Sequence, residues 1–276
     1  MRAGFTLPAT LLAAMPLVLG MLVPAFAQTY GGATAPPRTT DAAVLAARAR
    51  DREVRERFAR GLEAEARRDW EGAAAEFRRI VALNPSEPQN STARYDLALA
   101  EAGAGRDAEA VRLLEDALHR DPGFAAAAAN LVALQLRRGE VAAARAAADA
   151  FVALAPRSAM ARYDRGLAAL RAGDLAAARA DFRALLDADP AYAVAHYDLA
   201  LIEMRAGRDD AALAELGRAL GLSPAYARAR FALGAVLLRG GRRDDARVAF
   251  ARRAQDAEDP ALRALATDMR DRLAAP

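Results

Sequence analysis

The 276-residue sequence contains no cysteine, no lysine, only two histidines and few aromatic residues. The absence of cysteine excludes disulfide bonds, thiolate catalysis, cysteine-ligated zinc and a lipid-modified N-terminal cysteine. All 39 basic residues are arginine, and 36 acidic residues reduce the net charge to +3. Because no basic run exceeds two residues, we expect no nucleic-acid partner, despite a pI of about 9.6. An arginine-only basic set fits recognition of carboxylates or phosphates, but a GC-rich genome produces the same bias.

The residue types that carry most catalysis are also scarce. His119 and His196 are far apart in the sequence, and there is no nucleophile elbow, glycine-rich phosphate loop or cluster of metal ligands. His196 falls at a position that packs within a helix pair, and His119 falls at a helix end. We therefore predict a protein that is not an enzyme and that binds no cofactor and no metal.

The N-terminus has the pattern of an export signal. Arg2 is followed by an apolar stretch that ends in Ala25-Phe26-Ala27, a small-x-small cleavage site. We predict a signal peptide at 1–27, cleaved after Ala27, a flexible linker at 28–40, and a periplasmic or secreted mature protein with no stable membrane insertion. An uncleaved membrane anchor is the alternative interpretation of the same segment.

A period of 34 residues dominates the remaining sequence. Prolines, glycines and alanines each recur at this step and in a fixed phase relative to one another. The three series are Pro122, Pro156, Pro190 and Pro224; Gly105, Gly139, Gly173, Gly207 and Gly241; and Ala110, Ala144, Ala178, Ala212 and Ala246. A repeat of this length indicates a solenoid of identical supersecondary units rather than a globular enzyme.

Each unit has the pattern helix, turn, helix, stop. With 54% hydrophobic residues and many alanines, the composition favours packed helices. The glycine at position 15 is placed to end the first helix in the left-handed conformation, and the proline at position 32 blocks continuation of the second helix. Position 8 is small in every unit, which allows the two helices to cross closely. These residues are Gly61, Ala98, Val132, Gly166, Ala200 and Gly234.

Two stretches, RYDLALAEAGAGRDAEAVRLLEDALHRDP and HYDLALIEMRAGRDDAALAELGRALGLSP, show the unit most clearly. The pattern resembles the tetratricopeptide repeat family. This resemblance implies an all-α fold, a right-handed α-solenoid of antiparallel helix pairs. We predict that the solenoid occupies 41–276 and ends in a capping helix at 261–274. The six predicted repeats are 54–87, 91–124, 125–158, 159–192, 193–226 and 227–260.

In proteins of this family the first helices line a concave groove, and positions 5 and 13 commonly contact a partner. Here position 5 is usually aromatic and position 13 is arginine in four units. The candidate partner-binding residues are Tyr95, Tyr163, Tyr197, Phe231, Arg137, Arg171, Arg205 and Arg239. Aromatic and arginine side chains often make binding hot spots, but both residue types are also common at these positions for packing. Asp96, Asp164 and Asp198 are placed to pair with the arginine row.

These patterns predict a non-catalytic protein–protein interaction scaffold in the cell envelope. Its groove would bind an extended or helical segment of a partner, with some acidic character. The alternative is a homo-oligomeric structural component of an envelope assembly, which would self-associate and have no separate client.

Overall fold

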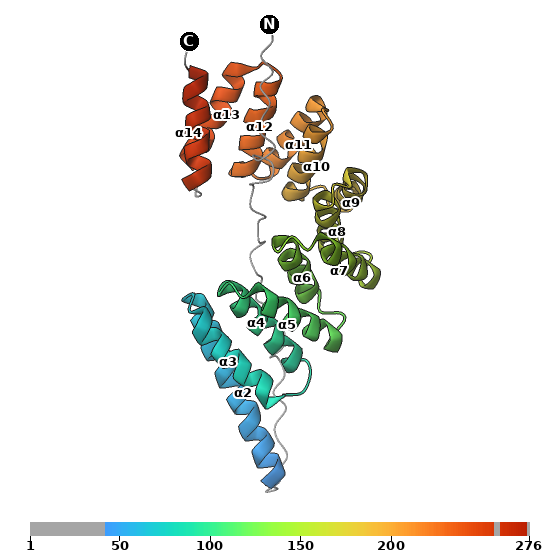
Figure 1. The fold of residues 1–276 in the computed structure, drawn as a ribbon, viewed down its shortest axis with the longest axis vertical. Coiled ribbons are helices and arrows are strands. Elements are labelled where there is room, and N and C mark those ends of the chain that lie inside the picture. The colour runs from blue at the N-terminus through green and yellow to red at the C-terminus, as the bar shows by residue number, and fades with distance from the viewer. Residues whose placement is uncertain (1–41, 257–259, 275–276) are drawn as a thin grey trace. The chain divides into compact units, whose positions relative to one another are not determined.

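The computed structural model describes residues 42–256 and 260–274, and all of its regular structure there is α-helical (Figure 1). The predicted signal peptide and linker lie outside the described residues. The helices are α2 (Ala42–Ala66), α3 (Trp70–Leu83), α4 (Gln89–Gly103), α5 (Asp107–Arg120), α6 (Ala125–Arg137), α7 (Val141–Leu154), α8 (Ala159–Arg171), α9 (Leu175–Ala188), α10 (Ala193–Arg205), α11 (Asp209–Leu222), α12 (Ala227–Arg239), α13 (Arg243–Asp256) and α14 (Pro260–Ala274).

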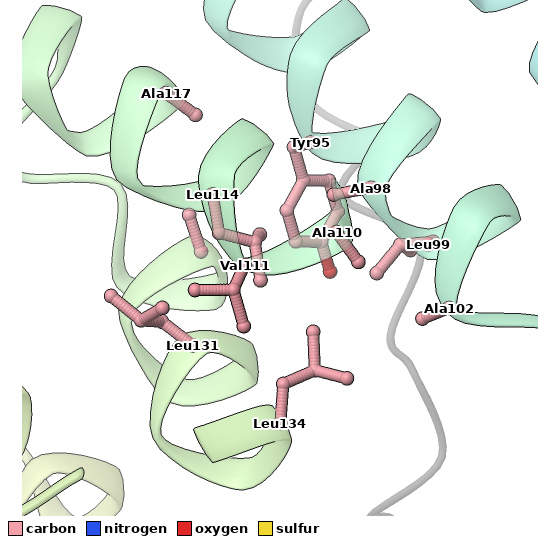
Figure 2. Packing of buried hydrophobic residues seen from close by; sticks show 11 residues of the cluster. Tyr95, Ala98, Leu99, Ala102, Ala110, Val111, Leu114, Ala117, Leu131 and Leu134 are labelled. Atoms are coloured by element: carbon pink, nitrogen blue, oxygen red, sulfur yellow. The ribbon is translucent and has the colours of Figure 1, made fainter. Parts of the chain in front are cut away.

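The chain divides into two compact units inside α8, one that ends at Asp164 and one that begins at Arg165. Within each unit, helices that follow one another in the sequence pack together, as a solenoid requires. The all-α prediction is confirmed. In the first unit, Tyr95 of α4 and Leu114 of α5 lie in a core cluster that Leu131 of α6 completes (Figure 2). In the second unit, side chains of α14 pack on the core around Phe250; they are Leu265, Met269 and Leu273.

The turns form as the glycine and proline series predict. The glycines after the first helices have positive φ, between 71° and 82°, the left-handed region in which glycine has no steric penalty. At the first of them, Gly105 N donates to the carbonyl of Ala102, and Arg106 N donates to the carbonyl of Glu101. The second helices α5, α7, α9 and α11 each end two residues before the repeat proline.

Residue size is matched between the two helices of each repeat. The side chain that faces position 8 lies sixteen residues later, at position 24 of the second helix. The pairs are Gly61 with Phe77, Ala98 with Leu114, Val132 with Ala148, Gly166 with Phe182, Ala200 with Leu216, and Gly234 with Phe250. All of these residues are buried. A Cβ at Gly61, Gly166 or Gly234 would lie 2.6–2.7 Å from the facing phenylalanine ring, so a phenylalanine at position 24 requires a glycine at position 8.

The first helix of the second repeat begins earlier than the period predicts. Its unit was predicted from Ser91, whereas α4 begins at Gln89, within the three-residue insertion after Pro85. The buried Asn90 accounts for the extension, because its Nδ2 donates to Asn84 Oδ1 at 2.7 Å and to the Pro85 carbonyl at 3.1 Å. The side-chain amide thus ties the inserted loop to the helix start.

We predict that Gly166→Ala destabilises the protein, although alanine favours helix formation elsewhere. The added methyl group overpacks the Phe182 ring, which typically costs about 1–3 kcal/mol. The double variant Gly166→Ala with Phe182→Leu recreates the alanine–leucine pair of the second and fifth repeats and should recover much of the loss. Urea unfolding followed by circular dichroism measures both effects.

Gly217→Ala is the matched control, because nothing lies within 4 Å of a Cβ at this α11 position. It should stabilise the protein by up to about 1 kcal/mol through helix propensity. A double variant no more stable than Gly166→Ala alone would contradict the size-matching argument.

Candidate partner-binding face

The predicted aromatic row lies mainly in the repeat cores. Tyr95, Tyr197 and Phe231 are 0%, 4% and 6% exposed, and Tyr163 is partly buried. Burial raises the pKa of Tyr95 to about 12, as expected for a phenol removed from water. The rings of Tyr95, Tyr197 and Phe231 therefore have almost no surface with which to contact a partner. The binding role assigned to the row stays a prediction.

Contacts between neighbouring helices hold these rings in place. The Tyr95 ring centroid is 4.9 Å from that of Phe124, and its hydroxyl accepts a hydrogen bond from Asn130 Nδ2 at 2.9 Å. Tyr197 lies 5.1 Å from Tyr226 in the corresponding place. In these two repeats position 5 packs against the residue just before the next first helix, whereas Phe231 packs on Phe250 of its own repeat. Both contacts agree with the packing interpretation of the sequence pattern.

The arginine row separates into two kinds of residue. Arg137 Nε donates to Asp107 Oδ2 at 2.7 Å, and Arg239 Nε donates to Asp209 Oδ2 at 2.7 Å. In both pairs Nη2 also donates to the other carboxylate oxygen, so each guanidinium forms a two-pronged ion pair. These two arginines are neutralised by the aspartate that begins the second helix of the preceding repeat.

Arg171 and Arg205 are different. Both are exposed, and neither forms a hydrogen bond or an ion pair within the described residues. The sequence explains the difference. Arg137 and Arg239 each have an aspartate thirty residues earlier, whereas Arg171 has Val141 and Arg205 has Leu175 at that distance. Partial burial lowers the pKa of Arg171, the charge of Arg205 lowers it further, and Asp198 opposes both effects. The guanidinium groups on α8 and α10 therefore act on each other, and the carboxylate of Asp198 acts on Arg171 without a hydrogen bond or ion pair to it.

The aspartates that were expected to pair with the row do not all do so. Asp96 and Asp164 are buried and form no ion pair within the described part of the chain, so the expectation is wrong for these two. Burial raises the pKa of Asp96 well above its ordinary value, and the nearby Glu65 raises it further. Burial also raises the pKa of Asp164 to about 8, and its Oδ2 has no hydrogen-bond partner.

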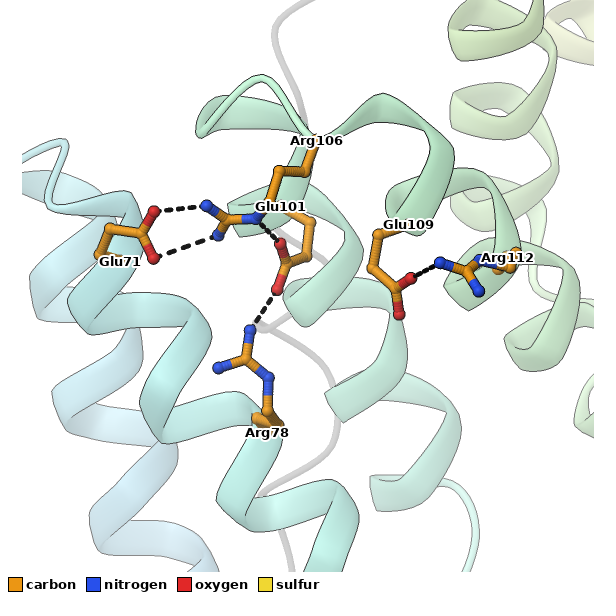
Figure 3. A network of polar contacts seen from close by, with 6 residues as sticks. All are labelled: Glu71, Arg78, Glu101, Arg106, Glu109 and Arg112. Atoms are coloured by element: carbon orange, nitrogen blue, oxygen red, sulfur yellow. Dashed lines mark hydrogen bonds and ion pairs between the residues drawn. The ribbon is translucent and has the colours of Figure 1, made fainter.

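A buried glutamate joins neighbouring repeats in a way that sequence reasoning missed. Glu101 of α4 is 2% exposed and accepts from Arg78 Nη2 of α3 at 2.5 Å and from Arg106 Nε, while Arg106 also pairs with Glu71 (Figure 3). Residues of this network also line an open cleft, together with the apolar side chains Val81, Leu97 and Leu113. The arginines of the cleft, Arg78, Arg106 and Arg112, are all paired with carboxylates. Paired charges leave this cleft without a free cation.

The same arrangement recurs in the second unit. Glu203 of α10 accepts from Arg179 Nε of α9 at 2.9 Å and from Arg208 Nε. The signal in the sequence is a glutamate at position 11 with an arginine five residues later, present in only the second and fifth repeats. This pairing of glutamate and arginine resembles no known motif, and a glutamate in a helix normally indicates an exposed face. The buried ion pairs were therefore not predicted.

The described residues contain no helix that is both long and apolar enough to cross a membrane. Within the same residues, no group of three or more histidines and carboxylates is arranged to hold a metal ion.

Comparison with known proteins identifies the repeat. A model of the tetratricopeptide repeat matches residues 58–125, 130–193 and 197–262, and a second model of the same repeat matches residues 169–220. The first model alone covers more than two thirds of the chain. The chain belongs to the tetratricopeptide repeat family. Members of this family are in general non-catalytic scaffolds that mediate protein–protein interactions, so a protein partner is the expected class.

Solved structures agree with the assignment. A thermophilic tetratricopeptide repeat protein of Thermus thermophilus is 26% identical, with a TM-score of 0.57 over 65% of this chain and 98% of that one. Two further structures are similar in fold, at lower sequence identity. They are pilF of Pseudomonas aeruginosa, at 16% identity and a TM-score of 0.62 over 79% of this chain and 97% of that one, and the Cut9–Hcn1 hetero-tetramer, at 18% and 0.63 over 80% and 43%. No curated protein matches the sequence.

We predict that Asp164→Asn stabilises the protein more at high pH than at low pH. A carboxyl group whose folded-state pKa is raised contributes best while protonated, so wild type loses stability as the pH rises from about 4 to about 8. The asparagine stays neutral, and its advantage at about pH 9 should reach roughly 1–3 kcal/mol, the usual cost of a buried unsatisfied group. Denaturant unfolding at about pH 5 and about pH 9 measures the difference.

Asp210→Asn, at an exposed aspartate of α11, is the control and should give the same small effect at both pH values. If Asp164→Asn shifts stability equally at the two pH values, the side chain is not held protonated by the fold.

Proposed function

We propose that this chain is an interaction scaffold of the cell envelope that binds an acidic segment of a partner protein at Arg171 and Arg205. The observation that supports the proposal is the contrast within the arginine row. Arg137 and Arg239 already have aspartate partners, whereas Arg171 and Arg205 are exposed, neighbouring and unpaired within the described residues. A guanidinium fork binds a carboxylate through two parallel hydrogen bonds, and aspartate and glutamate supply carboxylates on a partner protein.

Apolar side chains next to these arginines give the face a second component. Leu167 and Leu201 precede Arg171 and Arg205 by four residues, which is one helical turn, and both leucines are only partly buried. Each helix therefore presents a leucine and an arginine on the same face. The partner segment that fits has carboxylates alternating with apolar side chains, on an extended strand or along one side of a helix.

The charges of Arg171 and Arg205 favour binding of an acidic partner in two ways. Two like charges that disfavour each other are relieved when an anion binds between or beside them. Exposed guanidinium groups also attract acidic segments over several ångströms before contact, which accelerates association at low ionic strength. Salt should therefore weaken capture of the partner.

We predict that Arg171→Glu together with Arg205→Glu abolishes capture of the partner from an envelope extract by the immobilised mature chain. The change reverses both charges and should lower recovery by about tenfold or more, the scale of a lost pair of charge-assisted contacts. Quantitative mass spectrometry of the bound fraction at low and high salt measures recovery.

The matched control is Arg183→Glu with Arg247→Glu. These arginines are exposed on the second helices α9 and α13, so the variant has the same net charge but an intact Arg171–Arg205 face. Equal recovery by the two double variants would overturn the proposal. Recovery of only this chain itself would favour the homo-oligomeric alternative, which light scattering at two concentrations then tests directly.

The envelope location rests on the N-terminal sequence pattern. We predict that the mature chain begins at Gln28 and that Ala25→Leu with Ala27→Leu blocks processing, because signal cleavage requires small residues at these two positions. Intact-mass measurement of protein from a cell fractionation distinguishes the two forms. A wild-type chain that keeps residues 1–27 would instead support the uncleaved anchor.

A further inference from the structure

In the fourth and sixth repeats, an arginine at position 4 of the first helix binds the carbonyl of the proline that closes the preceding repeat. In α8, Arg162 Nε and Nη2 donate to the Pro156 carbonyl oxygen at 3.2 and 2.9 Å. In α12, Arg230 Nη2 donates to the Pro224 carbonyl oxygen in the same way. The side chain reaches back six residues and ties the loop before the helix to the helix itself.

Between these two repeats, the fifth repeat has a histidine at the same position. His196 Nε2 lies 3.0 Å from the Pro190 carbonyl oxygen, so the ring takes the place of the guanidinium. Its Nδ1 lies 2.7 Å from Oε2 of Glu215, on α11. The histidine is buried, and it connects the loop after α9, the helix α10 and the helix α11 through two short contacts.

Both groups that face the ring are acceptors. A carbonyl oxygen can only accept, and an ionised carboxylate can only accept, so both ring nitrogens must donate for both contacts to be hydrogen bonds. Only the imidazolium has two N–H groups. In either neutral tautomer one nitrogen lone pair would face an oxygen lone pair at hydrogen-bond distance, and that contact would become repulsive.

The surroundings of the ring supply no alternative donor. From α11, Glu215 also accepts from Arg218 Nη1, so its carboxylate lies between the His196 ring and the Arg218 guanidinium. From the loop after α9, the facing group is the Pro190 carbonyl. Helices α9 and α12 also pack on α10, and within the described residues neither forms a hydrogen bond or an ion pair with the His196 ring.

We propose that His196 is a proton-dependent latch that holds the fifth repeat together when protonated and releases it when neutral. Arginine stays charged at every physiological pH, whereas histidine loses its proton within the neutral range. The repeats on either side thus have a permanent clamp at position 4, and the fifth repeat has one that responds to pH.

The direction of the response follows from which form of the ring can donate to both oxygens. Only the doubly protonated ring donates to both, so we expect the latch to contribute to stability at low pH and to lose that contribution as the pH rises. The released elements are α10 and α11. Loss of the latch should therefore appear as easier local opening of this helix pair rather than as unfolding of the whole chain.

Native-state hydrogen exchange of the full mature chain tests the latch, with rates corrected for the intrinsic effect of pH. Between about pH 5.5 and about pH 8, we expect protection of α10 and α11 amides in wild type to fall by about tenfold relative to His196→Arg, the scale of one charge-assisted hydrogen bond. His196→Arg copies Arg162 and Arg230 and stays charged. His196→Gln stays neutral and should show low protection at both pH values.

His119→Gln is the control, because His119 is exposed at the end of α5 and should leave the wild-type profile unchanged. Nitrogen-15 NMR of wild type provides a readout that needs no variant and should show both ring nitrogens of His196 protonated at about pH 5.5. A neutral His196 ring at that pH, or identical pH profiles for wild type and His196→Arg, would overturn the proposal.

Discussion

The contact between position 8 of the first helix and position 24 of the second is the constraint on which the rest of the structure depends. Where the second helix has phenylalanine, the first has glycine; leucine faces alanine, and alanine faces valine. The matched sizes let the two helices of a repeat pack closely, because interiors tolerate neither voids nor overlaps.

The packing of the repeats decides which side chains stay exposed. Position 5 is turned toward the next repeat, so Tyr95 and Tyr197 become packing residues, while position 13 stays at the exposed end of the helix. At position 13 the outcome depends on a residue thirty positions earlier. Asp107 forms an ion pair with Arg137, but Leu175, at the corresponding position, has no charge with which to pair with Arg205. The proposed binding face therefore depends on two positions on different helices.

Much of the fold could be predicted from the sequence because glycine, proline and small residues act locally. Gly105 has the positive φ expected at a helix end, and α5 stops before Pro122. The candidate site was harder to predict, because an aromatic residue at position 5 suits both a core and a groove. The partner of Arg137 and one partner of Glu101 lie in the preceding repeat. A period along the sequence gives the position of a residue within its repeat, but it does not show which side chains of different repeats meet.

The buried carboxylate of Glu101 has a consequence for how this protein can gain or lose repeats. Its charge is balanced by Arg78 from the first repeat and by Arg106, which Glu71 of the first repeat holds in turn. Deleting the first helix pair would remove Arg78 and Glu71 and leave Arg106 as the remaining partner of Glu101, on a helix face that α3 no longer covers. The second repeat is therefore fitted to an N-terminal neighbour through charge as well as through its core, and a shortened array would need a different residue at position 101.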